Sequence, residues 1–183
     1  MEESPLFQKM RQALGPGLTG REEQGGREVM VLAASALLSC IGVLREDPEL
    51  AFEMLIDLGG ADYSTYSDPK ELPLCVSYHL YSPKYNHRAW LKVYLPVEQA
   101  EVDSLSHIFA GANWYERECW DMYGIVFRGH PYMKRLLLYD EFVGHPLRKD
   151  YPILKMQPLI PMRNAVDYEA VAVRNRLDSG EKD

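Results

Sequence analysis

The stretch from Asn113 to Pro152 constrains this chain more than any other part. It combines closely spaced aromatic, charged and turn-forming residues that a generic core segment would not need. Its first third predicts a helix with Asn113 as the N-cap, Glu116 as the capping-box partner three residues on, and Gly124 at the C-terminal end. We therefore expect a helix followed by an irregular, polar connection.

Helical periodicity divides the side chains of this predicted helix into an apolar face and a polar face. Glu116 lies at the edge of the apolar face, where an ionised carboxylate is costly unless a cation or backbone donors meet it. We expect Arg135 or Arg148 to be that partner, and we predict that Glu116 and Arg135 are buried structural charges. The polar face holds Trp114, Arg117, Glu118 and Asp121.

Two similar turns follow the predicted helix. Gly129-His130-Pro131 and Gly144-His145-Pro146 lie fifteen positions apart, and each places a histidine between a flexible residue and a proline. The two histidines could ligate a metal together with Glu141 or Asp150, but the spacing matches no recognised metal motif. We favour structural histidines bonded to the backbone.

The motifs WYERECWDMYGI, FRGHP, KRLLLY and GHPLRKDYP occur in this order along about forty positions. They resemble the signature of the C subunit of bacterial NADH:quinone oxidoreductase (respiratory complex I), the relative of the mitochondrial thirty-kilodalton subunit. The resemblance implies a non-catalytic structural subunit of the peripheral arm that braces the quinone-site large subunit, which is of the D type. It further implies neighbouring iron–sulfur subunits, electron flow from NADH to quinone, and coupled proton translocation.

The same resemblance implies that this chain binds no cofactor, and that FMN and the iron–sulfur clusters belong to partner subunits. It places the chain on the cytoplasmic side of the inner membrane, attached only through the complex, as a separate subunit and not fused to the D-type large subunit. Relatives in membrane-bound hydrogenases and the photosynthetic NDH complex share the signature, so an equivalent role there is the alternative.

The residues after Gly144 are the predicted docking surface. Arg148, Lys149, Asp150 and Tyr151 form a polar row, and the apolar residues Ile153, Leu154 and Met156 follow among prolines up to Met162. Proline blocks a helix or an inner strand, and so many apolar side chains favour an arm that lies on another protein. We expect one domain over residues 1–152 and an arm with a frayed tail over residues 153–183.

Composition excludes several classes of protein. The formal charge of −7 and the pI near 5.3 disfavour a general nucleic-acid binder. Three separated cysteines give no disulfide framework, zinc site or iron–sulfur motif, and they suit a reducing compartment. The acidic N-terminus lacks the features of a signal or transit peptide, so we expect a cytoplasmic, prokaryotic protein.

The first half of the chain predicts three helices and a strand. Ser4 caps a helix that Pro5 opens and Gly15-Pro16 ends. The glycines at 15, 17 and 20 spell a dinucleotide fingerprint, but a helix precedes them and a polar loop is expected up to Gly26. The apolar run 29–44 is too short for a membrane span and predicts a strand followed by a helix. Asp47-Pro48 predicts another helix, which ends at Gly59-Gly60.

A strand meander is predicted next. Residues 62–66 form its first strand, and alternation over 74–81 and 88–95 gives the two clearest strands in the chain. A short helix is expected over 104–110. The predicted fold class is α+β, with a small mixed or antiparallel sheet, packed helices and an extended C-terminal arm.

Two alternative functions rest on single features of the sequence. One face of the two clear strands combines basic and aromatic groups that could bind single-stranded RNA, and acidic net charge opposes this. Catalysis by Glu116, Glu118 and Asp121 is disfavoured because Glu116 and Glu118 point to different faces of the helix. The RNA-binding face would consist of His79, Tyr81, Arg88, Trp90, Lys92 and Tyr94.

Overall fold

A five-stranded mixed sheet organises the protein, and a computed structural model describes it over residues 3–67 and 71–159. The strand order is β1-β2-β5-β4-β3, with β2 and β5 parallel and the other neighbours antiparallel. The strands are β1 (Leu18–Gln24), β2 (Arg27–Leu32), β3 (Met54–Asp62), β4 (Leu74–Ser82) and β5 (His87–Leu95), and a separate parallel pair consists of β6 (Glu101–Asp103) and β7 (Val126–Arg128). This confirms the α+β class and the mixed sheet.

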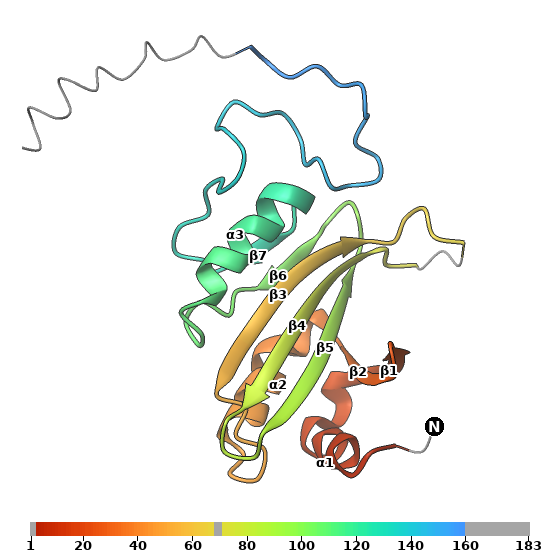
Figure 1. The fold of residues 1–183 in the computed structure, drawn as a ribbon, viewed down its shortest axis with the longest axis vertical. Coiled ribbons are helices and arrows are strands. Elements are labelled where there is room, and N and C mark those ends of the chain that lie inside the picture. Colours follow the sequence, from red (N-terminus) through yellow and green to blue (C-terminus); the bar gives the residue numbers. More distant parts are fainter. Residues whose placement is uncertain (1–2, 68–70, 160–183) are drawn as a thin grey trace, which may run out of the picture.

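Three α-helices pack around the sheet. The helices are α1 (Pro5–Leu14), α2 (Leu37–Glu46) and α3 (Ala112–Tyr123), and two short 3-10 turns cover Gly15–Gly17 and Ala34–Ala36. Figure 1 shows α1 and α2 near one end of the sheet and α3 near the other, with the chain beyond β7 running past α3 as an irregular segment. No helix in the part of the chain that the structure describes has the length and apolar composition needed to cross a bilayer.

The core consists of the inward-facing side chains of the strands and of the helices that pack on them. Leu74, Val76, Tyr78 and Leu80 on β4 are fully buried, and every second residue of β5 lies beside them. The buried side chains of α2, including Leu37, complete the same cluster. The predicted strands over 74–81 and 88–95 are thus confirmed, and so are the strand and helix within the run 29–44.

The predicted helix beginning at Asp47-Pro48 is wrong. Its region forms a turn and then strand β3, whose backbone pairs with β4 along the edge of the sheet. Gly60, expected to end that helix, lies inside the strand, and its missing side chain leaves room for the Tyr123 ring of α3. Tertiary pairing with β4 therefore overrides the local helical pattern.

Three smaller predictions also fail. Of the predicted strand 62–66, only Asp62 lies in a strand, as the last residue of β3, and a turn follows it. The expected polar loop before Gly26 contains strand β1, which pairs with β2 as a hairpin. The region 104–110 contains turns in place of a helix. By contrast, α1 begins and ends as predicted, with the Ser4 hydroxyl accepting from the backbone N–H of Phe7.

Candidate partner-docking site

Helix α3 is the element on which the site is built. It ends as predicted at Gly124, whose φ of 73° is the left-handed conformation that glycine adopts without strain. It begins earlier than predicted, with Gly111 as the N-cap, so Asn113 lies inside the helix. The predicted capping box between Asn113 and Glu116 does not form, because the Glu116 side chain is engaged elsewhere.

Glu116 is fully buried, but neither Arg135 nor Arg148 pairs with it. Its two carboxylate oxygens accept from the Ser104 hydroxyl and from the backbone N–H of Leu105, each at 2.6 Å. Burial raises the pKa of Glu116 to about 7, although these two donors act against the rise. The predicted arginine partner was wrong because the loop after β6 supplies neutral donors to this carboxylate.

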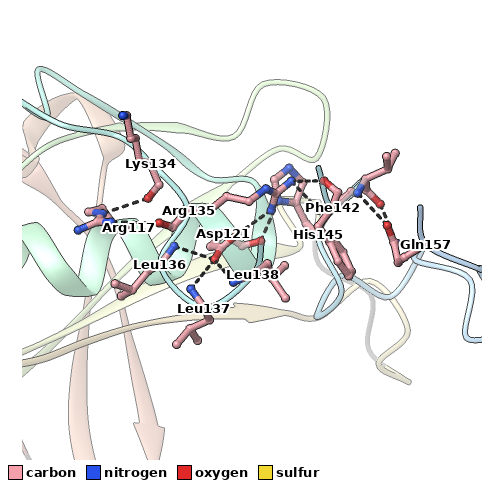
Figure 2. A network of polar contacts seen from close by, with 12 residues as sticks. Arg117, Asp121, Lys134, Arg135, Leu136, Leu137, Leu138, Phe142, His145 and Gln157 are labelled. Atoms are coloured by element: carbon pink, nitrogen blue, oxygen red, sulfur yellow. Dashed lines mark hydrogen bonds and ion pairs between the residues drawn. The ribbon is translucent and has the colours of Figure 1, made fainter. Parts of the chain in front are cut away.

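Asp121, expected on the solvated face of the helix, is the buried carboxylate that takes the arginine. Its Oδ1 accepts from the Arg135 guanidinium at 2.6 Å. Its Oδ2 accepts from three successive backbone N–H groups, those of residues 136, 137 and 138, at 2.8–3.0 Å (Figure 2). Burial alone would raise the pKa of Asp121, but the Leu138 and Leu137 N–H groups and the Arg135 guanidinium lower it.

Two arginines extend this network along the chain. Arg135 donates to the carbonyl oxygen of Phe142 at 2.7 Å, which folds residues 135–142 into a closed loop. Arg117 of α3 donates from two nitrogens to the carbonyls of Lys134 and Arg135, each at 3.0 Å. We call the Asp121, Arg135 and Arg117 side chains the clamp, because they hold residues 134–144 against α3 (Figure 2).

The two Gly-His-Pro turns attach the same segment to both ends of α3. His130 Nε2 lies 3.1 Å from the carbonyl oxygen of Asn113, and His145 Nδ1 lies 3.0 Å from that of Asp121. The backbone N–H of Tyr132 donates to His130 Nδ1, so Nε2 carries the proton. The preference for histidines bonded to backbone is confirmed, and no group of three potential metal ligands occurs within residues 3–67 and 71–159.

Two of the C-terminal carbonyls of α3 bond to this segment, and a third bonds to the Gly124 cap. Gly124 N–H donates to the Trp120 carbonyl, and Leu147 N–H donates to the Met122 carbonyl. His145 Nδ1 is hydrogen-bonded to the Asp121 carbonyl, which lies between those two in the sequence. A helix end normally leaves such groups to water or a cap. Residues 129–147, although irregular, are therefore bonded to both ends of α3.

The predicted docking residues lie immediately beyond the clamp. Arg148 pairs with Asp150 at 3.1 Å, and the Lys149 backbone N–H donates to Asp62 at the end of β3. Tyr151 stacks on Phe142 with ring centroids 6.1 Å apart. The structure thus places the four residues of the polar row on one loop. The Lys149 backbone and the Tyr151 ring face the rest of the protein and are not free for a partner.

The apolar arm is open to solvent in this chain. Ile153, Leu154, Met156 and Leu159 are 89–97% exposed and follow one another without regular structure. Gln157 bonds with both the N–H and the carbonyl of Val143, which fixes the arm to the clamped segment. The remaining predicted arm residues, 160–162, and the tail to 183 lie outside the described residues.

Known proteins resemble this chain over most of its length. The family described as the 30 kDa subunit of respiratory-chain NADH dehydrogenase matches residues 30–157. The C subunit of NADH-quinone oxidoreductase from Burkholderia multivorans is 40% identical over 179 residues, which is 93% of this chain and 88% of that protein. The chain belongs to this family. It is accordingly a subunit of a multi-subunit assembly of the complex I type.

Solved structures agree with this membership of the 30 kDa subunit family. A trypsin-resistant fragment (1–134) of Nqo5 is 30% identical, covers 69% of this chain and 98% of the fragment, and has a TM-score of 0.58. A chain of an archaeal membrane-bound sulfane sulfur reductase complex is 21% identical, with 80% and 84% coverage and a TM-score of 0.63. The latter likeness establishes the fold alone.

The sheet face considered for RNA has less free positive charge than its sequence suggested. Lys92 is buried and pairs with Glu22 at 3.0 Å, and the Tyr94 hydroxyl donates to the same carboxylate at 2.7 Å. Two of the six groups are therefore engaged within the sheet, one of them a cation that RNA phosphates would need. This geometry weakens the RNA alternative for this member of the 30 kDa subunit family.

Asp121 is the residue of the candidate site that sequence reasoning missed. One signal was available: a carboxylate in the last turn of a helix faces the negative end of the helix dipole and is unfavourable there without a specific partner. The partners, however, are backbone groups of residues 136–138, which no side-chain pattern identifies. The three cysteines, Cys40, Cys75 and Cys119, are all buried.

Proposed function

We propose that this chain is a non-catalytic structural subunit in the peripheral arm of an NADH:quinone oxidoreductase. In this role it braces the quinone-site large subunit on the cytoplasmic side of the membrane, so that electrons pass from NADH through iron–sulfur clusters to quinone while protons are translocated. FMN and the clusters are held by partner subunits. The family membership supports the complex, and the docking site supports the bracing role.

The observation that carries the proposal is the nearly complete exposure of four apolar side chains on an anchored arm. Burying Ile153, Leu154, Met156 and Leu159 in a partner would remove several hundred Å² of apolar surface from water, at about 25 cal/mol per Å². A free monomer rarely exposes so much apolar surface on one short segment. The arm is therefore suited to an obligate contact.

Because the clamp holds the arm to the folded domain, a partner bound to the arm would have a fixed position relative to that domain. Electron transfer and quinone reduction need cofactor-bearing subunits held at fixed separations, and a flexible tether would not provide this. Gln157 and Tyr151 attach the arm to residues 142–143. Because Arg135 bonds both to the Phe142 carbonyl and to Asp121 of α3, the arm is continuous with the folded domain. Preorganisation of this kind reduces the entropy lost on binding.

A native pull-down from source membranes, with a tag at Met1, tests the proposal. We expect a quinone-site large subunit and iron–sulfur subunits to co-purify, while the isolated chain is colourless and silent in EPR. Ile153→Asp/Leu154→Asp should abolish this recovery, whereas the control Ile153→Leu/Leu154→Met, which keeps apolar area, should preserve it. Purification of the wild-type chain alone would refute the proposal.

Partners recovered in the same experiment distinguish related assemblies. An equivalent role in a membrane-bound hydrogenase or a photosynthetic NDH complex would bring hydrogenase or NDH subunits in place of an NADH-oxidising module. The likeness to a chain of an archaeal respiratory complex shows that this fold occurs in more than one assembly. The docking chemistry proposed above is the same in each case.

A further inference from the structure

Met156 is the most exposed methionine in the part of the chain that the structure describes, and it lies in the docking arm. Its side chain is 89% exposed, whereas that of Met54, at the start of β3, is 48% exposed. Met10, Met30 and Met122 are buried in the domain. The thioether sulfur of Met156, the only sulfur between residues 153 and 159, is therefore open to reagents in solution.

Both neighbours of Met156 in the chain are attached to the folded domain. The Lys155 ammonium lies 5.4 Å from the centre of the Tyr151 ring. Gln157 bonds to the Tyr151 hydroxyl and to the backbone N–H and carbonyl of Val143 (Figure 2). The backbone on either side of Met156 is thus held against the clamped segment, while the Met156 side chain between them stays in solvent.

An exposed thioether reacts with peroxides. A lone pair of the sulfur attacks one oxygen of hydrogen peroxide, and the O–O bond breaks as the S–O bond forms. The second oxygen leaves as water with both protons. Sulfur is oxidised by two electrons, the peroxide is reduced by two, and the product is methionine sulfoxide.

The sulfoxide changes the chemistry of the docking surface. Methionine is a flexible, apolar side chain, and its sulfoxide places a polar oxygen at the same position. Ile153, Leu154 and Leu159 in the same arm are 93–97% exposed, so a partner that covers the arm must match an apolar surface. A sulfoxide oxygen buried in such a contact would lose its hydration without gaining a hydrogen-bond donor.

We propose that Met156 is a site of reversible oxidation, and that its sulfoxide prevents the arm from docking on the partner subunit. The inference rests on the proposed function, because it concerns the chain before a partner covers its arm. Docking would bury the thioether and protect it, whereas the unassembled subunit stays open to peroxide. Methionine sulfoxide reductases convert the sulfoxide back to methionine, so the block is reversible.

Peptide mass spectrometry after brief treatment with hydrogen peroxide tests the site of oxidation. In the isolated full-length chain, Met156 should be oxidised first, Met54 next, and the buried Met30 last. In the assembled complex from source membranes, Met156 should react more slowly than in the isolated chain. Oxidation of Met54 ahead of Met156, or equal rates for Met156 in the isolated chain and the complex, would overturn the inference.

Recovery of partners measures what the sulfoxide does to docking. The tagged wild-type chain is oxidised, freed of peroxide, and added to solubilised membranes of a strain that lacks this chain. It should recover about tenfold less of the quinone-site large subunit than the untreated chain, a factor in the range expected for one unpaired buried acceptor. Methionine sulfoxide reductase should restore the recovery. Oxidised and untreated chains should unfold at the same temperature, because Met156 is exposed in the free chain.

Two variants assign the effect to one sulfur. Peroxide should lower the recovery by Met54→Leu as it does for the wild type, and it should leave the recovery by Met156→Leu at the level of that variant without peroxide. Equal recovery by oxidised and untreated wild type, or the same loss in Met156→Leu, would overturn the inference. If the oxidised wild type docks normally while Ile153→Asp/Leu154→Asp does not, only this inference fails. If the untreated wild type recovers no partner, the proposed function is refuted, and this inference with it.

Discussion

Asp121 and Arg135 form an ion pair at 2.6 Å in which the carboxylate is completely buried and the guanidinium side chain is 12% exposed. The pair joins the last turn of α3 to a segment that has no regular structure. Because Asp121 also accepts from three successive backbone N–H groups, one side chain fixes the path of the backbone after Arg135. Residues 135–144 owe their path along α3 to this arrangement.

Asp121→Asn should release residues 135–144 from α3. An amide has one acceptor oxygen and directs its N–H₂ group at donors, so it cannot satisfy the three backbone groups and Arg135 together. Breaking a buried pair by changing one partner costs about 3 kcal/mol or more. We expect amide exchange at residues 136–138 to accelerate about a hundredfold, since about 2.7 kcal/mol corresponds to that factor. Trypsin should also cut after Lys134 and Arg135.

Asp150→Asn provides the control for that experiment. Asp150 pairs with Arg148 in the same part of the chain, but its side chain is 66% exposed, so its loss should have little effect on exchange or cleavage. Equal protection of residues 136–138 in wild type and Asp121→Asn would contradict the clamp.

Glu116→Gln should change how stability depends on pH. The folded-state pKa of Glu116, about 7, lies above the unfolded value, so the folded state binds the proton more tightly and wild-type stability falls as pH rises from about 4.5 to 7. Glutamine has no such titration. We therefore expect the free energy of unfolding of the wild type to fall by about 3 kcal/mol relative to that of the variant when the pH rises from about 5 to about 8. Urea unfolding at the two pH values measures this difference.

Glu118→Gln separates this effect from a general loss of charge. Glu118 is an exposed carboxylate on the same helix. The free energy of unfolding of Glu118→Gln should therefore change between the two pH values by the same amount as that of the wild type. If Glu116→Gln behaves in the same way as this control, the buried carboxylate does not titrate as described.

Gly60→Ala should destabilise the contact between β3 and α3. A Cβ at this position would lie 2.5 Å from the Tyr123 ring, and overpacking of this kind costs about 1–3 kcal/mol. Gly59→Ala is the adjacent control, since a Cβ there would have no neighbouring atom within 4 Å among the described residues, and it should be neutral or slightly stabilising. Thermal unfolding compares the two, and an equal loss in both would exclude the steric explanation.

Arg148→Ala should lower the amount of assembled complex without changing the redox chemistry of the complex that remains. Arg148 orders Asp150 beside the arm, and its charge helps to lower the pKa of Asp62, whose carboxylate binds the Lys149 N–H. Blue-native electrophoresis measures assembly, and NADH oxidation per assembled complex measures chemistry. Wild-type assembly levels would count against a docking role for Arg148.

The sequence alone determined the parts of this protein in which local chemistry and structure agree. Ser4 and Pro5 specify the start of α1, Gly124 specifies the end of α3, and the alternation of β4 and β5 specifies the centre of the sheet. The motifs of the stretch after Asn113 were also sufficient for the family. In each case the decisive groups lie within a few residues of one another.

Only the tertiary structure decided which carboxylate meets which partner, and whether residues 54–62 form a helix or a strand. Glu116 and Asp121 lie on one helix, yet the loop after β6 supplies neutral donors to the first, while Arg135 and three backbone N–H groups reach the second. Strand β3 exists because β4 offers it a pairing edge. Backbone donors and strand edges belong to every sequence alike, so side-chain patterns cannot reveal where the fold will bring them together.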